Sequence, residues 1–307
     1  MSECSEPDVT RSRLESAFHL VGRQALELAS VPTAAATSTG IARRITRELL
    51  IGCHGIRRAV VSATEPGVVA GMALLDSGVS PDPAGSWTAL HDDGDHVGSG
   101  EPLIMVVGSA WELAVAEDHV MGTLGVASGL AMRGLSLCQA APKGLRIACG
   151  GWKKLPRSMK PVLHAALDVA GLSHRLVEDD FVYIDKNVVT SIGGVEIAVH
   201  TGRALEHGPV AVQVRTLEEA HSAVTAGCSI VMVDSGSLDD LRRIHQMIQA
   251  TGRRKDVQIA FGGGVGLSDL EPAHRAGADI VDVGRALLNG PLWDLRMEVQ
   301  SLDAHNT

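Results

Sequence analysis

Aromatic side chains are scarce in this chain, which has one Tyr, three Phe and four Trp among its 307 residues. Small residues are abundant instead, with 34 glycines alone. This composition favours the close packing of small side chains in an α/β fold over an all-β sandwich. Apolar residues make up 45% of the chain and charged residues 21%, which is typical of a globular protein, and the length allows two modest domains.

Positive charge is also in short supply. The chain has 27 Lys and Arg against 36 Asp and Glu, for a formal net charge of −9. No broad basic surface is available to neutralise a phosphate backbone, so we expect no nucleic-acid partner. A small phosphorylated molecule needs only helix N-termini and one or two cations, so it stays a candidate ligand.

Paired cysteines and long apolar runs are missing as well. The five cysteines are scattered without a CxxC pair: Cys4, Cys53, Cys138, Cys149 and Cys228. This spacing predicts neither a disulfide nor a metal site and suits a reducing cytosol. The N-terminus has no apolar core behind a basic start, and no run approaches about 18 apolar residues. We therefore expect no membrane segment and a cytoplasmic location.

The second half of the sequence alternates between apolar runs and helical segments. Predicted buried strands lie at residues 210–214, 230–233, 257–260 and 280–283, with weaker ones upstream at 145–149 and 182–184. Thr216 with Glu219, and Ser268 with Glu271, have the spacing of capping boxes that begin helices. Strand, capped helix, glycine and strand in series is typical of βα units around a parallel sheet. The pattern predicts a parallel α/β barrel.

The first half predicts a mixed module of helices and strands. Helices are expected at residues 13–28, 41–50 and 110–133, and strands near 58–62, 68–74 and 103–107. Residues 77–100 are rich in Pro, Gly and Asp and predict loops with a hairpin. The expected organisation is a disordered N-terminus over 1–10, an N-terminal α/β sandwich over 11–140, the barrel over 141–292 and a C-terminal tail over 293–307.

One gap-free stretch, residues 151–195, carries ten residues at the spacing of a known enzyme family. They are Lys153, Pro156, Gly171, His174, Arg175, Asp180, Asn187, Gly193, Gly194 and Val195. Shorter matches are GVVAG at 67–71, ASGLA at 127–131, LEEA at 217–220, MVD at 232–234, GG at 262–263 and DVG at 282–284. From about residue 41 to 292 the chain resembles the quinolinate phosphoribosyltransferases, or nicotinate-nucleotide pyrophosphorylases, which make nicotinate mononucleotide.

The resemblance implies a fold, a partner and a reaction class. The fold is an N-terminal α/β sandwich followed by an α/β barrel. The partner is a second copy of the chain, because in that family the neighbouring subunit's long helix completes each active site. The reaction is transfer of a phosphoribosyl group by a pentosyltransferase. Mg²⁺ is the one cofactor implied, and we expect no organic cofactor and assign no residue as a metal ligand.

Departures from the family pattern fall on its anion-binding positions. Quinolinate is a dianion that the family holds with cations, and four of those cations are replaced here by Asp118, Trp152, Met159 and Asp185. A unit-charge contact at 4 Å is worth on the order of 4 kcal/mol at an effective dielectric constant of about 20. Replacing attraction by repulsion should therefore make quinolinate binding weak.

Two family carboxylates are also replaced, by Ala211 and Gln213, in the strand that matches V-E-V-E-V. Gln213 can still hydrogen-bond hydroxyl groups but cannot neutralise a cation. Asp234 remains as the acid expected beside a ribose hydroxyl or Mg²⁺. In the last phosphate-side motif, Asp282 stands where the family's S-V-G has its serine.

The candidate catalytic residues are Lys153, His174, Arg175 and Asp234. By the resemblance, Lys153 would face a phosphate or carboxylate, and Arg175 would hold a carboxylate with His174 as a donor or proton carrier. Lysines and His-Arg pairs are also ordinary surface residues, which is the alternative interpretation of each.

The candidate substrate-binding residues are Asp118, Trp152, Asp185, Gln213, Gly262, Gly263 and Gly284. Trp152 is either a packing residue or a platform for a heteroaromatic ring. Asp118 and Asp185 either pair with nearby Arg or Lys or face the pocket, where they would favour an amine-bearing ligand. The glycines form either a tight turn or a phosphate-binding loop.

Three functions remain open at this point. The first is transfer of a phosphoribosyl group from phosphoribosyl pyrophosphate (PRPP) to a heteroaromatic or related carboxylic acid other than quinolinate. The second is a lyase, decarboxylase or cyclase that acts on a small carboxylate without PRPP. The third is a non-catalytic binding subunit, which does not explain why Lys153, His174, Arg175 and Asp234 are kept.

Overall fold

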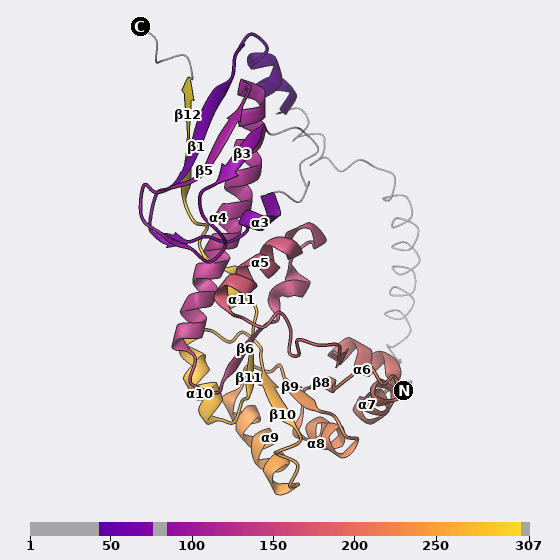
Figure 1. The fold of residues 1–307 in the computed structure, drawn as a ribbon. Coiled ribbons are helices and arrows are strands. Elements are labelled where there is room, and N and C mark those ends of the chain that lie inside the picture. The colour runs from indigo at the N-terminus through magenta and orange to yellow at the C-terminus, as the bar shows by residue number, and fades with distance from the viewer. Residues whose placement is uncertain (1–42, 76–84, 302–307) are drawn as a thin grey trace, which may run out of the picture. The chain divides into compact units, whose positions relative to one another are not determined.

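The computed structural model describes residues 43–75 and 85–301 of the chain (Figure 1). The predicted disordered residues 1–10 and the predicted helix at 13–28 lie outside the described residues. The chain divides into two units, residues 1–55 and 56–307. Of the first unit, residues 43–49 are described as helical, within the helix predicted at 41–50. The second unit contains both the N-terminal sheet and the barrel.

The N-terminal domain contains a four-stranded antiparallel sheet. Its strand order is β12 (Leu295–Ser301), β1 (Arg57–Ala63), β5 (Pro102–Gly108) and β3 (Ser86–Ala89). Alternate residues of β1 are buried, namely Ala59, Val61 and Ala63, so one face of the sheet packs on a core. The strands predicted near 58–62 and 103–107 are confirmed.

The strand predicted at 68–74 is largely wrong. Only β2 (Gly67–Val68) is extended, paired with β4 (His96–Val97), and α3 (Met72–Leu75) follows. Gly71 turns the chain with a φ of +92°, a conformation that side-chain-bearing residues rarely adopt. Asp93 then accepts a hydrogen bond from the Met72 backbone N–H at 2.7 Å, which begins the helical turn.

The C-terminal segment is not only a tail. Strand β12, inside the segment predicted as a tail, pairs in register with β1 from Arg57–Ser301 to Ala63–Leu295. Trp293, just before it, is 2% exposed, and its indole N–H donates to the backbone oxygen of Glu65 at 3.1 Å. The chain therefore returns from the barrel to complete the N-terminal sheet.

Helix α4 (Ala110–Ala140) joins the two domains. Ser109 caps its first turn, with a reciprocal bond from the Ser109 backbone N–H to Glu112 at 2.7 Å. Leu124 belongs to the apolar cluster of the N-terminal sheet and Leu137 to that of the barrel. By length and composition α4 could cross a membrane, but 56% of its most apolar 18-residue window is buried in the protein, as in a core helix.

The barrel domain is built on a parallel sheet of six strands. Their order is β6 (Arg146–Cys149), β11 (Ile280–Val283), β10 (Gln258–Phe261), β9 (Ile230–Val233), β8 (Val210–Val214) and β7 (Val182–Ile184). In the described part of the chain no ladder joins β6 to β7, so the curled sheet forms an incomplete barrel (Figure 1). This confirms the predicted α/β fold class.

Helices follow the strands around the sheet. They are α5 (Lys160–Ala170), α6 (Lys186–Ile192), α7 (Val195–Ala204), α8 (Leu217–Thr225), α9 (Leu238–Ala250), α10 (Leu270–Arg275) and α11 (Arg285–Leu288). Thr216 caps α8 by accepting from the Glu219 N–H at 3.1 Å, as predicted. The cap predicted at Ser268 is wrong, because Asp269 instead accepts from the Gly266 N–H at 2.8 Å before a short 3₁₀ turn.

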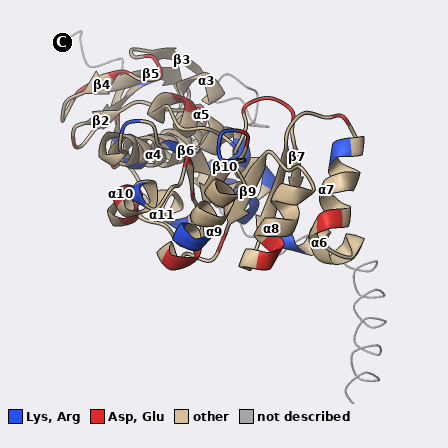
Figure 2. Ribbon diagram, turned by 90° about the horizontal axis from the view of Figure 1, so that it is seen from below, with Lys and Arg blue, Asp and Glu red and all other residues tan. Residues whose placement is uncertain are grey.

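The two faces of the parallel sheet pack differently. Small and apolar residues fill the concave side, including Ala148, Ala211, Met232 and Ala260. The convex side packs against the helices in a larger apolar cluster. Acidic and basic residues are interspersed along the helices in the view of Figure 2.

Candidate functional site

A cavity of about 470 Å³ opens where the strands of the parallel sheet end. It is lined by Cys149, Gly150, Trp152, Lys153, Lys154, Arg175, Leu176, Phe181, Tyr183, Asp185, Lys186, Asn187, Gln213, Met232, Asp234, Gly263, Gly264, Asp282, Gly284 and Arg285. Several of these residues stand at or just after the carboxyl ends of β6, β7, β8, β9 and β11. In α/β barrels this end of the strands carries the active site.

Most of the predicted site residues lie in this cavity. The structure brings together Trp152, Lys153, Arg175, Asp185, Gln213, Asp234, Gly263 and Gly284. These residues are spread over more than 130 positions of the sequence, so the order of the strands, not local spacing, assembles the site.

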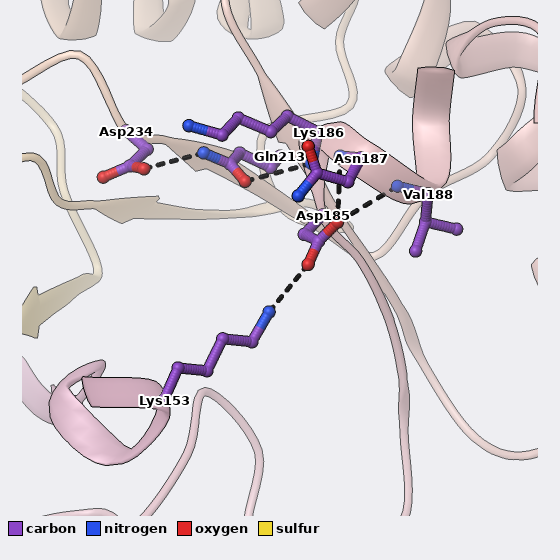
Figure 3. Close-up of polar contacts among 7 residues, drawn as sticks. All are labelled: Lys153, Asp185, Lys186, Asn187, Val188, Gln213 and Asp234. Atoms are coloured by element: carbon purple, nitrogen blue, oxygen red, sulfur yellow. Dashed lines mark hydrogen bonds and ion pairs between the residues drawn. The ribbon is translucent and has the colours of Figure 1, made fainter. Parts of the chain in front are cut away.

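An ion pair joins two of these residues across the cavity. Lys153 donates from Nζ to Oδ2 of Asp185 at 2.7 Å (Figure 3). Asp185 also caps α6, because its Oδ1 accepts from the backbone N–H of Asn187 at 2.9 Å and of Val188 at 3.0 Å. The Lys153 ammonium group and these backbone donors lower the pKa of Asp185, which keeps it ionised.

A second polar chain links the ends of β8 and β9. Gln213 donates from Nε2 to Oδ2 of Asp234 at 2.7 Å, and its Oε1 accepts from the Lys186 backbone N–H at 3.1 Å (Figure 3). Gln213 is 7% exposed, so both ends of its amide are used in a buried position. This bond fixes one oxygen of Asp234, so a side chain from the neighbouring strand β8 orients the Asp234 carboxylate in the cavity.

Three of the chain's few aromatic residues stand in the cavity with its cations. The guanidinium carbon of Arg175 lies 4.5 Å from the Phe181 ring centre and 5.7 Å from that of Trp152. The Lys153 ammonium lies 5.2 Å from the Tyr183 ring and 5.5 Å from Trp152. These are cation–π distances, so the rings hold the cations in place. Trp152 is partly buried against the barrel core, which makes it a packing residue as well as a lining residue.

The glycine loop after β10 is pressed against the loop after β9. Gly263 has a φ of +98°, and a Cβ there would lie 2.9 Å from the Ser235 carbonyl carbon. The Gly236 N–H donates to the Gly262 oxygen at 3.0 Å. Gly262 itself does not line the cavity. A Cβ on Gly262 would lie 2.7 Å from Cε of Met232 and 3.3 Å from Oδ1 of Asp234. Glycine at this position therefore leaves room for these two cavity-lining side chains.

Sequence reasoning missed an acidic residue on the concave side of the sheet. Asp282, in β11, faces the cavity between the ends of β6 and β10. A Cβ on Gly150 would collide with its carboxyl, so glycine at 150 is what makes room for it. Burial, and repulsion from Asp234, raise the pKa of Asp282 to about 7. Its departure from the S-V-G motif was the only sequence signal.

Lys154 and Arg285 also line the cavity. The Lys154 ammonium lies 2.8 Å from where a Cβ on Gly284 would be, so it rests on the turn that follows β11. The cations beside this glycine turn are therefore Lys154 and Arg285, whereas Lys153 is already paired with Asp185.

Besides Gly262, two predicted residues are not brought to the cavity. His174 turns away from it, because its Nε2 lies 2.7 Å from Oδ1 of Asp168 and its ring stacks on His164 at 4.6 Å. Asp118 lies on α4 and does not line the cavity of its own chain. A role for Asp118 in the cavity of a second subunit stays a prediction, as does the homodimer itself.

The donor set does not fit a metal ion held by the protein. The described residues include no cluster of three His, Cys, Asp or Glu side chains that could hold one. Asp234 already gives one oxygen to Gln213. A requirement for Mg²⁺ brought by a bound phosphate stays a prediction.

A family model describes this part of the chain. Residues 138–298, just over half of the chain, match the model of the quinolinate phosphoribosyl transferase C-terminal domain. The chain belongs to the quinolinate phosphoribosyltransferase family. It is therefore a member of a family of pentosyltransferases, as the resemblance in its sequence predicted.

Relatives of this family member cover most of its length. It is 27% identical over 266 residues to a probable nicotinate-nucleotide pyrophosphorylase [carboxylating] of Methanothermobacter thermautotrophicus, covering 84% of this chain and 94% of the relative. It is 26% identical over 255 residues to the human nicotinate-nucleotide pyrophosphorylase [carboxylating], covering 81% and 84% respectively.

Solved structures confirm the fold. The nicotinate-nucleotide pyrophosphorylase of Francisella tularensis superimposes with a TM-score of 0.68 at 20% identity, covering 88% of this chain and 98% of that one. The enzyme of the same name from Ehrlichia chaffeensis gives a TM-score of 0.71 at 14% identity, covering 88% and 100%. At these identities the likeness concerns the fold alone.

Proposed function

We propose that this family member transfers a phosphoribosyl group from PRPP to a heteroaromatic or related carboxylic acid other than quinolinate. The Lys153–Asp185 ion pair carries this proposal. Lys153 is a cation kept from the family pattern, and here a carboxylate in the same cavity neutralises it. A dianionic acceptor would meet that carboxylate in place of the lysine expected at position 185.

Arg175 is the residue best placed for a single carboxylate. It lines the cavity, and among the described residues it makes no ion pair. Its contacts with Phe181 and Trp152 fix the plane of the guanidinium group without using its hydrogen-bond donors. Arg175 can therefore offer two parallel N–H groups to the acceptor's carboxylate.

The opposite side of the cavity suits the phosphosugar. Lys154 and Arg285 supply positive charge beside the glycine turns at 263–264 and 284. Asp234, oriented by Gln213, can accept a hydrogen bond from a ribose hydroxyl. Phosphoribosyl transfer requires PRPP and the acceptor acid to be held in line. It also requires the negative charge of the departing pyrophosphate to be stabilised, and positioned cations can do this.

A second candidate function rests on Ala211. In this position, where the family pattern has a glutamate, the side chain is 0% exposed within the concave core. Ala211 has no carboxylate to offer, and this favours a lyase, decarboxylase or cyclase that grips a small carboxylate substrate with Arg175 and does not use PRPP.

Calorimetric titration of the purified protein with PRPP, with and without Mg²⁺, separates the two functions. Quinolinate serves as the second ligand, because the family's name makes it the first acceptor to exclude. Binding of PRPP without binding of quinolinate supports the proposed transferase. Tight binding of quinolinate contradicts the proposed acceptor class, and failure of PRPP to bind contradicts the transferase and leaves the lyase.

A further inference from the structure

Three carboxyl groups line the cavity in the described part of the chain, and of these Asp282 alone has no identified partner or structural role. Asp185 pairs with Lys153 and caps α6, and Asp234 is held by Gln213. Within the described residues, no hydrogen bond or ion pair to Asp282 occurs, and its side chain lines the cavity. An unpaired carboxyl on the concave face of a barrel is unfavourable unless a ligand or a proton compensates it.

The neighbours of Asp282 set how it can be used. Asp234 from β9 faces it with like charge, and Lys153 and Lys154 from the turn Gly151–Lys154 face it with opposite charge. Tyr183 from β7 and Cys149 from β6 also lie within its field, and burial raises the pKa of both above their usual values. Both neighbours are thus neutral near pH 7, so Lys154 is the main cation available on its side.

Asp282 lies next to the side of the cavity that carries Lys154 and Arg285. Gly284 follows two residues later, and the Lys154 ammonium group rests on the turn that contains it. A phosphate held by Lys154 and Arg285 would lie against the Asp282 carboxyl. An ionised carboxylate would repel that phosphate, whereas a protonated carboxyl would donate a hydrogen bond to it.

We propose that Asp282 is a specificity-determining residue that binds the phosphosugar as a protonated carboxyl, donating a hydrogen bond to a phosphate oxygen. This inference rests on the proposed use of PRPP. The raised pKa of about 7 supports it, because the carboxyl already holds its proton in part of the neutral population. A bound phosphate raises the pKa further, so binding takes up a proton above about pH 7.

Proton uptake is measured by titrating the whole chain with PRPP in buffers of different ionisation enthalpy, at about pH 6 and about pH 8. We expect uptake of a large part of one proton at the higher pH and much less at the lower pH. Wild-type affinity should fall by up to about tenfold per pH unit above the pKa. Asp282→Asn, which stays neutral and keeps a donor, should bind at both pH values without this uptake.

Asp256→Asn is the matched control, since this aspartate is an exposed partner of Arg253 outside the cavity. It should keep the wild-type proton uptake. Equal uptake by Asp282→Asn and wild type would overturn the assignment. So would net proton release on PRPP binding at about pH 8, because a carboxyl that is protonated in the complex can only take up a proton.

Inorganic pyrophosphate and ribose 5-phosphate, titrated separately, show which phosphate meets Asp282. They also keep this inference distinct from the proposed function. If PRPP does not bind to wild type at either pH, the proposed transferase fails, and uptake with pyrophosphate alone would still support Asp282 as a phosphate contact. If neither probe binds with proton uptake, the inference about Asp282 fails too.

Discussion

Lys153 and Asp185 form an ion pair at 2.7 Å inside the cavity, although they lie 32 residues apart in the sequence. Their side chains are 46% and 22% exposed, so water screens the pair in part. The other carboxylate oxygen of Asp185, Oδ1, caps α6. The pair therefore leaves this part of the cavity without the net positive charge of a free lysine, and Asp185 also fixes where α6 begins.

Replacing Asp185 by Asn should strengthen binding of anionic ligands. Asn keeps the cap on α6 but removes the negative charge, so Lys153 becomes available. With partial screening we expect a gain of about 1 kcal/mol, roughly fivefold in affinity for PRPP or quinolinate. Calorimetry measures it, with Asp239→Asn as a control, since Asp239 is an exposed aspartate in an ion pair on α9. Unchanged affinity in Asp185→Asn would show that Lys153 does not meet the ligand.

Arg175 and His174 are neighbours in the sequence, but replacing them should affect ligand affinity to very different extents. Arg175 lines the cavity, and we expect Arg175→Ala to lose at least about tenfold in ligand affinity, as befits loss of a charged hydrogen bond. His174 is bonded to Asp168 outside the cavity, and His174→Ala should change affinity by less than about twofold. Titration of both variants with the same ligand tests the pair. A larger loss in His174→Ala would restore His174 to the site.

Sequence patterns predicted the elements whose signals are local. The five residues of β8 are all buried, and their apolar run stood out in the sequence. The cap at Thr216 needs only Glu219, three residues away. By contrast, β12 forms an edge strand by pairing with β1, more than 230 residues earlier. Its alternation of Leu295, Met297 and Val299 is short, and nothing near it in the chain shows what it packs against.

The same limit applies to the candidate site. Lys153, Arg175 and Asp234 could be predicted because a family pattern marks their positions. That His174 turns away depends on Asp168 and His164, which its own motif does not contain. The space for Asp282 depends on Gly150, on a different strand. Whether a charged residue is buried can be known only once the three-dimensional positions of the surrounding strands and helices are known.

Asp282 should lower stability as the pH rises. Its pKa is raised from the usual 3.8 to about 7, so between these values the folded protein holds a proton that the unfolded chain has lost. Stability therefore falls from about pH 4 to about pH 7 and then levels off. Removing the carboxyl in Asp282→Asn should be neutral near pH 4 and stabilising near pH 8, by on the order of 1–3 kcal/mol. Urea denaturation at both pH values measures this, and an equal effect at both would contradict the assignment.

Ser128 on α4 should be important for the stability of the N-terminal domain. It is 0% exposed, its Oγ accepts from the Ala70 N–H at 2.9 Å, and it donates to the Ala70 oxygen at 3.3 Å. Ser128→Ala leaves both backbone groups without this partner, so we expect a loss of about 1–3 kcal/mol. Ser136→Ala on the same helix should cost far less, because Ser136 bonds only to its own helix at Met132. Similar losses in the two variants would show that the buried bond adds little.

Replacing two adjacent glycines in turn distinguishes the effect of backbone strain from the effect of contact between loops. Gly263 and Gly264 have φ values of +98° and +94°, so Ala at either position should cost about 1–2 kcal/mol. A Cβ on Gly264 meets nothing within 4 Å, whereas one on Gly263 would lie 3.0 Å from the Gly236 Cα and would push the loop after β10 off the loop after β9. Gly263→Ala should therefore lose more stability than Gly264→Ala. It should also weaken pyrophosphate binding several-fold more, if these loops hold a phosphate. Denaturation and pyrophosphate titration of both variants test this, and equal pyrophosphate affinity would mean that the close approach of the loops serves the fold alone.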